Sequence, residues 1–128
     1  MPSYIERTLA GTIARVSASF PALLLTGPRQ VGKTTLLEAC AESGRGYVTL
    51  DDLDQRELAQ RDPALFLQRH APPLIIDKVQ YAPQLFGAIK LAIDRTRRPG
   101  LFWLTGSQKF HLMQGITESL AGRVAILD

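Results

Sequence analysis

One short segment, residues 27–34 with the sequence GPRQVGKT, constrains the fold of this chain more than any other feature. It lies between an apolar run, Ala22–Thr26, and an amphipathic stretch from Lys33 to about Ser43 that predicts a helix. The segment fits the pattern G-x-x-x-x-G-K-[ST] in full, in the order strand, glycine loop, helix. The inward backbone N–H groups of such a loop, together with the helix N-terminus, form a cradle for phosphate oxygens. The alternative is a chance glycine turn, which this order disfavours.

The residue types within the segment suit a bound polyphosphate. Gly27 and Gly32 permit backbone angles and close approaches that a Cβ atom would block. Lys33 supplies a mobile positive charge for the terminal phosphates, and the Thr34 hydroxyl can ligate Mg²⁺, which prefers oxygen ligands. The residues expected to bind the nucleotide are Gly27, Pro28, Arg29, Gln30, Val31, Gly32, Lys33, Thr34 and Thr35.

Short apolar runs alternate with amphipathic stretches along the rest of the chain, and this alternation predicts parallel strands joined by helices. Strands are expected at 22–26, 47–50, 74–77, 101–105 and 123–127. Helices are expected at 3–19, 33–43, 55–61, 63–69 and 83–98, with helical pieces at 108–114 and 117–121. The strands show almost no polar alternation, so both faces of the sheet should be covered, and ligands should bind at the carboxyl ends of the strands.

A carboxylate ends the third apolar run, Leu74–Asp77, some forty residues after the loop. This is the Walker B arrangement, in which Asp77 would hold Mg²⁺. The alternative is an ordinary aspartate that starts a turn. The next residue is Lys78, where many ATPases with this layout carry a glutamate that orients the attacking water. A protonated lysine has no acceptor, so the water would need another group, and the candidates are Asp51, Asp52, Gln80 and Glu118.

Two further polar positions flank predicted strands. Ser107, and after it Thr105, would reach from the end of the fourth strand toward the γ-phosphate or the attacking water. A helix N-cap is the alternative for Ser107. Arg123, just before the last strand, could stabilise transition-state charge in its own chain or in a neighbouring subunit. The alternative is a surface arginine at a strand start. The residues expected to serve catalysis are Lys33, Asp77, Lys78, Ser107 and Arg123.

These segments together resemble one family, the AAA-type ATP-binding proteins of bacteria and archaea that carry a C-terminal domain of unknown function. The resemblance rests on residues 24–35 (LLTGPRQVGKTT), with support from Leu50–Asp52, Ile75–Pro83, Leu104–Gln108 and Ser119–Arg123. It implies a P-loop three-layer α/β fold, with a mainly parallel five-stranded sheet in the order 5-1-4-3-2 and helices on both faces. It also implies ATP and Mg²⁺ as ligands.

The chain departs from the family pattern at two points. Lys78 replaces the glutamate of an Asp-Glu pair, so ATP hydrolysis is in question although ATP binding is not. The family continues well past the fifth strand, whereas this chain ends at Asp128, so we expect one ATP-binding domain over 1–128 without the C-terminal domain. Two hypotheses follow: an ATPase that yields ADP and phosphate, and a nucleotide-binding switch that does not hydrolyse ATP.

Composition disfavours several other classes of function. The chain has one cysteine, Cys40, and no asparagine, which disfavours a multi-cysteine zinc site and the Asn-Lys-x-Asp signature of a GTPase. Its net charge of +3 suits an anionic ligand but is too weak to indicate nucleic acid by itself. No apolar run approaches the length of a membrane helix and no signal peptide is evident, so a cytoplasmic location is expected. Assembly into a homo-oligomer stays open, because Arg123 could act on a neighbouring subunit.

Overall fold

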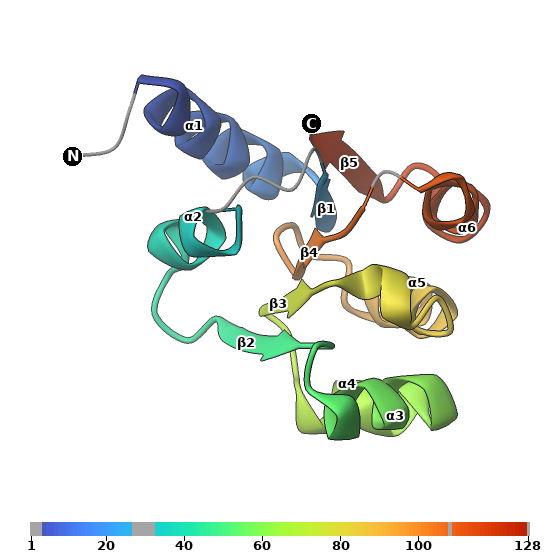
Figure 1. Cartoon of the computed structure of the whole chain (residues 1–128). Helices are drawn as coiled ribbons and strands as arrows, with labels where there is room; N and C mark the ends of the chain where they lie inside the picture. Colours follow the sequence, from blue (N-terminus) through green and yellow to red (C-terminus); the bar gives the residue numbers. More distant parts are fainter. Residues whose placement is uncertain (1–3, 27–32, 108, 128) are drawn as a thin grey trace.

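The computed structural model describes residues 4–26, 33–107 and 109–127, and a five-stranded sheet of parallel strands lies at its centre. The strands are β1 (Ala22–Leu25), β2 (Gly46–Thr49), β3 (Leu74–Asp77), β4 (Phe102–Thr105) and β5 (Val124–Leu127). Their order across the sheet is β2-β3-β4-β1-β5 (Figure 1). This is the expected order read from the other edge, so the predicted α/β class and topology are confirmed.

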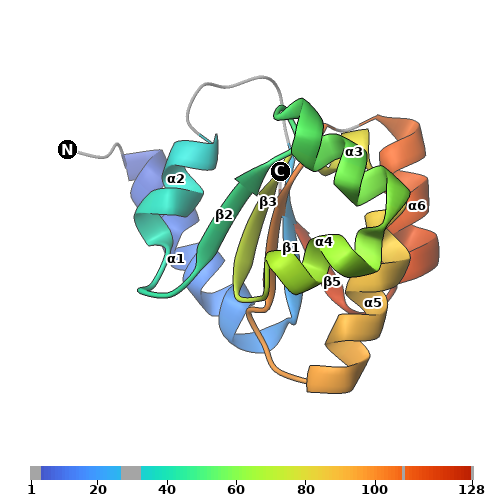
Figure 2. The ribbon, with the colours of Figure 1, turned by 90° about the horizontal axis from the view of Figure 1, so that it is seen from below.

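Helices cover both faces of this sheet. They are α1 (Tyr4–Ser19), α2 (Lys33–Cys40), α3 (Leu53–Arg61), α4 (Pro63–Arg69), α5 (Leu85–Thr96) and α6 (Phe110–Leu120), with a short 3-10 helix η1 (Val79–Tyr81). Helices α1 and α2 lie on one face, and α3 to α6 lie on the other (Figures 1 and 2). Among the described residues, no helix combines the length and apolar character needed to cross a bilayer.

The sheet separates two apolar cores. Trp103, Leu23 and Ile13 belong to the core beneath α1 and α2. Leu24 and Phe86 belong to the larger core beneath α3 to α6. Neighbouring residues of β1 therefore point into different cores, and this explains why the three inner strands are buried throughout while the edge strands β2 and β5 are partly exposed.

Several predicted helices have different limits in the structure, and the differences at α2 and α6 are the largest. Helix α2 ends at Cys40 rather than at Ser43. The two pieces expected at 108–114 and 117–121 form the single helix α6, which runs without a break through Gly115. A Cβ atom on Gly115 would lie 3.3 Å from ring carbons of Phe86, so this glycine allows α6 to approach α5 closely. The sequence pattern suggested a helix break where the structure has a helix–helix contact.

A buried arginine organises the amino ends of the strands. The Arg45 side chain is only 1% exposed, and its guanidinium lies 3.9 Å from the centroid of the Trp103 ring. It donates two hydrogen bonds to the Glu42 carboxylate, at 2.6 and 3.1 Å, and one to the Gly100 carbonyl. Trp103 donates in turn to Ser17 Oγ at 2.9 Å. Helix α1, the segment before β2 and the segment before β4 are therefore joined at this edge.

Gly100 tests how closely these segments pack. Its φ is +72°, and an added Cβ atom would lie 2.8 Å from Ser17 Oγ, whereas Gly44, with a φ of +96°, has open space around it. We expect Gly44→Ala to lower the free energy of unfolding by about 1 kcal/mol, from backbone strain alone, and Gly100→Ala to lower it by about 3 kcal/mol, from strain and the steric clash together. Urea unfolding followed by circular dichroism measures both. Equal losses in the two variants would contradict the close packing at Gly100.

Candidate functional site

The Asp77 carboxylate is the centre of a polar cluster at the carboxyl ends of the strands. It is the last residue of β3 and is only 6% exposed. Its Oδ1 accepts hydrogen bonds from Thr34 Oγ1 at 2.9 Å and Thr105 Oγ1 at 2.5 Å, and its Oδ2 accepts one from Thr49 Oγ1 at 2.9 Å. The carboxylate therefore joins α2, β2 and β4, and these hydroxyl donors supply the hydrogen bonds that a buried charge requires.

The sheet register explains why these hydroxyls meet. Thr49 is the register partner of Asp77, and Thr105 follows Leu104, the register partner of Ile76. Tyr47 lies two residues before Thr49, and its phenol is 3.4 Å from Asp77 Oδ2. Burial, and then the charge of Asp77, raises the pKa of the Tyr47 phenol, so it remains a donor at neutral pH.

Most of the predicted phosphate loop lies outside the described residues. This applies to residues 27–32 and to the side chain of Lys33. The flanking elements are described: β1 ends at Leu25, and α2 begins at Lys33. Thr34 is half-buried in the first turn of α2 and bonded to Asp77, whereas Thr35 is exposed. The loop therefore connects the carboxyl end of a central strand to the start of a helix, as the sequence pattern predicts.

Lys78 turns the chain sharply after Asp77. Its φ of 67° and ψ of 51° are left-handed, and its backbone N–H donates to Thr105 Oγ1 at 3.0 Å. Its ammonium is 2.8 Å from Asp51 Oδ2, and the hydrogen bond to Asp51 raises the pKa of the lysine. The side chain is therefore charged at neutral pH and donates to Asp51, so it offers no acceptor to a water molecule.

The two candidates at the end of β4 have different surroundings. Thr105 is 5% exposed, and its hydroxyl bonds to both Asp77 and the Lys78 backbone. Ser107 Oγ is buried and has no hydrogen-bond partner within the described part of the chain. The same is true of Gln80 Oε1. Thr105, the second choice from sequence, thus lies in the Asp77 cluster, while the Ser107 hydroxyl forms no hydrogen bond with the described residues.

Whereas Asp77 lies at the carboxyl ends of the strands, Arg123 lies at their amino ends. It immediately precedes β5, whose first residue, Val124, pairs with Ala22 at the amino end of β1. Its guanidinium donates to both carboxylate oxygens of Asp94, at 2.8 and 3.1 Å. The structure does not bring Arg123 to Asp77 of the same chain. Arg123 precedes its strand and Asp77 ends its strand, so in a parallel sheet the two residues lie at opposite ends of the strands.

The other acidic candidates for orienting water are occupied by hydrogen bonds. Asp52 caps α3, accepting from the backbone N–H groups of Asp54 and Gln55, and Glu118 accepts from Gln114 on α6. Across the described residues, no group of three or more His, Cys, Asp or Glu side chains could hold a metal ion by itself. A divalent ion at Asp77 would therefore need ligands from a bound phosphate and from water.

Thr49 is the contact that sequence reasoning missed. It precedes Asp51 by two residues and resembles any threonine near the end of a strand. The signal that could have identified it is the sheet order implied by the family resemblance, which places the second strand beside the third. Their carboxyl ends then adjoin, so the last residue of β2 reaches the carboxylate that ends β3.

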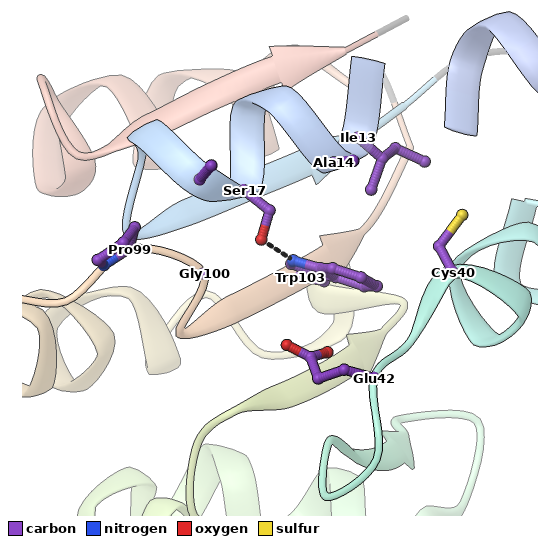
Figure 3. A pocket seen from close by; sticks show the side chains of 9 residues that line it. Ile13, Ala14, Ser17, Cys40, Glu42, Pro99, Gly100 and Trp103 are labelled. Carbon is purple, nitrogen blue, oxygen red and sulfur yellow. Dashed lines mark hydrogen bonds between the residues drawn. The ribbon is translucent and has the colours of Figure 1, made fainter. Parts of the chain in front are cut away.

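An open hollow of about 320 Å³ lies elsewhere, between α1, α2 and the start of β4. Figure 3 shows Trp103 in the lining, with its indole hydrogen-bonded to Ser17, and Cys40 and Glu42 nearby. The hydrogen bond from Arg45 lowers the pKa of the Glu42 carboxyl. Glu42 is thus paired with Arg45, and Ser17 with Trp103, so these polar groups of the lining already have partners.

Comparison with known proteins agrees with this geometry. An uncharacterized protein of Mycobacterium bovis and one of Mycobacterium tuberculosis are each 36% identical to this chain over 125 residues. The match covers 96% of this chain but 28% of each relative, so the chain spans just over a quarter of their length. A family model described as an AAA domain matches residues 19–128. This chain therefore belongs to the AAA domain family of nucleotide-binding ATPases.

Proposed function

We propose that this chain binds ATP with Mg²⁺ and hydrolyses it slowly to ADP and phosphate. The observation that carries the proposal is the 2.9 Å hydrogen bond from Thr34 Oγ1 to Asp77 Oδ1. It connects the helix that follows the phosphate loop with the carboxylate that ends β3. That pairing of elements is what a phosphate loop and a metal-binding carboxylate need if they are to act on one polyphosphate.

The donor set fits a hard divalent cation. Asp77 and Thr34 offer a carboxylate and a hydroxyl, which are oxygen ligands of the kind Mg²⁺ prefers, and phosphate oxygens and waters complete such sites. These two residues would hold the ion, which when bound supplies positive charge that neutralises phosphate oxygens. Lys33 would pair with the terminal phosphates, and Ser107 would offer its unpartnered hydroxyl to the γ-phosphate.

A nucleotide-binding switch with no hydrolysis is the second candidate. The ion pair between Lys78 and Asp51 favours it, because the residue after Asp77 cannot accept a hydrogen bond from water. Both candidates share ATP binding and differ in turnover. Action on nucleic acid and assembly into an oligomer are further proposals, and Arg123 could contribute to a neighbouring active site only if its pairing with Asp94 were released.

Lys33 tests the phosphate loop. Removing a charged hydrogen-bond donor to phosphate should cost about 1.5–3 kcal/mol, so we expect Lys33→Ala to weaken Mg·ATP binding by at least about tenfold. Titration of a fluorescent ATP analogue measures the change. Lys90→Ala on α5 is the matched control, because Lys90 is an exposed lysine outside the Asp77 cluster. Equal affinity of the Lys33→Ala variant and the unaltered chain would defeat the proposal.

Thr49 tests the support of Asp77. Thr49→Val keeps the shape of the side chain but removes the hydrogen bond to Asp77 Oδ2 and the one accepted from the Asp51 backbone. A less restrained carboxylate should raise the Mg²⁺ concentration for half-maximal ATP binding by at least about threefold, which is only part of the about 1.5–3 kcal/mol that one charge-assisted hydrogen bond contributes. Magnesium titrations at fixed ATP measure this, with Thr49→Ser as the variant that keeps the hydroxyl. Identical curves for valine and serine would exclude a supporting role.

Substitutions at Lys78 test whether the lack of a carboxylate after Asp77 slows ATP hydrolysis. A general base contributes about 10²–10⁴ in rate, so we expect Lys78→Glu to raise steady-state phosphate release at saturating Mg·ATP by at least about tenfold. Lys78→Ala is the control, because it removes the ammonium without adding a carboxylate. A rate for Lys78→Glu no higher than that for Lys78→Ala would show that the missing carboxylate does not limit turnover.

A further inference from the structure

Two buried polar atoms on the segments that follow β3 and β4 have no hydrogen-bond partner within the described residues. They are Gln80 Oε1 and Ser107 Oγ. Buried polar groups in folded proteins are nearly always hydrogen-bonded, and an unsatisfied one costs about 1–3 kcal/mol. A folded chain that keeps two such atoms at the carboxyl edge of its sheet has acceptors available for a ligand or a water molecule.

Gln80 lies against the segment that follows β4. A Cβ atom on Gly106 would be 3.5 Å from Gln80 Oε1, so the amide oxygen approaches the backbone between Thr105 and Ser107. Thr105 is the residue whose hydroxyl holds Asp77 Oδ1. The Gln80 amide thus adjoins the strand end that positions the proposed metal-binding carboxylate.

The short helix that carries Gln80 is held from several sides. Lys78 starts it with a left-handed turn, and Val79 is fully buried. The Tyr81 carbonyl accepts from Gln60 Nε2 at 2.6 Å, and the guanidinium of Arg56 lies 3.8 Å from the centroid of the Tyr81 ring. Contacts from α3 therefore fix η1 on the carboxyl side of Gln80, and the β3 end fixes it on the other side. A side chain on such a support is suited to orienting a small molecule.

We propose that Gln80 Oε1 accepts a hydrogen bond from the water that attacks the γ-phosphate, and this rests on the proposed ATP hydrolysis. Lys78 has no acceptor, Asp51 accepts from Lys78, and Asp52 caps α3. The Gln80 oxygen, in contrast, is an acceptor that has no hydrogen-bond partner in the described part of the chain. An amide can orient a nucleophilic water in phosphoryl transfer without serving as a base.

The step balances without a protein base. The water oxygen bonds to the γ-phosphorus as the bond from that phosphorus to the bridging oxygen of ADP breaks. ADP leaves with the electron pair of the broken bond. One proton of the water is lost to solvent, and the other stays on the new phosphate. The Gln80 amide accepts a hydrogen bond from the water and takes up no proton. Loss of this orientation should lower turnover and leave binding of ATP in the ground state intact.

The test compares Gln80→Met with the unaltered chain and with Gln84→Met, a control at an exposed glutamine four residues away. Three quantities are measured: the affinity for Mg·ATP, the affinity for Mg·ADP with aluminium fluoride, which imitates the phosphorus under attack by water, and phosphate release. We expect Gln80→Met to keep the Mg·ATP affinity within about threefold, to weaken the aluminium fluoride complex by at least about tenfold and to slow phosphate release by at least about tenfold. Its thermal unfolding midpoint should not fall, because methionine removes an unsatisfied buried oxygen.

Each contrary outcome points to a different failure. If the unaltered chain does not bind Mg·ATP, the proposed function fails and this inference with it. If the chain binds Mg·ATP but Gln80→Met matches Gln84→Met in the other two measurements, the inference fails and the proposed binding stands. If Gln80→Met lowers the unfolding midpoint and Mg·ATP affinity together, Gln80 has a structural role and the inference is overturned.

Discussion

The carboxylate of Asp77 is the point on which the carboxyl edge of this sheet depends. A charge buried to this extent is stable only when hydrogen-bond donors surround it, and three threonine hydroxyls do so. Each hydroxyl comes from a different element. The hydrogen bonds that Asp77 needs therefore fix β2, β4 and the start of α2 relative to β3. Thr105 extends the constraint, because it also holds the backbone of Lys78 and hence the turn that leads to η1.

The two edges of the sheet have different polar chemistry. At the amino edge, Arg45 and Arg123 are each engaged by a carboxylate through two hydrogen bonds. At the carboxyl edge, Gln80 and Ser107 each keep a buried oxygen without a partner among the described residues. Arg45 also keeps one buried nitrogen, Nη1, without a partner among the described residues, so the contrast concerns the carboxylate pairing of the arginines and the free acceptors of Gln80 and Ser107. The proposed site thus lies at the carboxyl ends of the strands, where parallel sheets usually present their ligand sites.

Local patterns in the sequence were sufficient for the inner strands and for Thr34 and Asp77, whereas the order of the strands in the sheet came from the family resemblance. The inner strands were predictable because they are apolar on both faces, and Thr34 and Asp77 because each has a fixed place beside a strand end. Thr49 could not be found this way, since register between neighbouring strands depends on the sheet order. The position of Arg123 required the direction of β5, and the continuity of α6 required its contact with Phe86. The unpartnered oxygens of Gln80 and Ser107 emerge only from three-dimensional packing.

Helix α1 packs on the core of this chain, although it lies before the residues that the family model matches. The family match begins at residue 19, where this helix ends. Yet Ile13 on that helix is wholly buried, and Ser17 accepts the hydrogen bond of the Trp103 indole. A protein cut at the start of the match would expose the indole and leave the α1-facing side of β1 open to water. The family model and the packed core therefore have different limits, because the core also includes Ile13 on a helix that precedes the match.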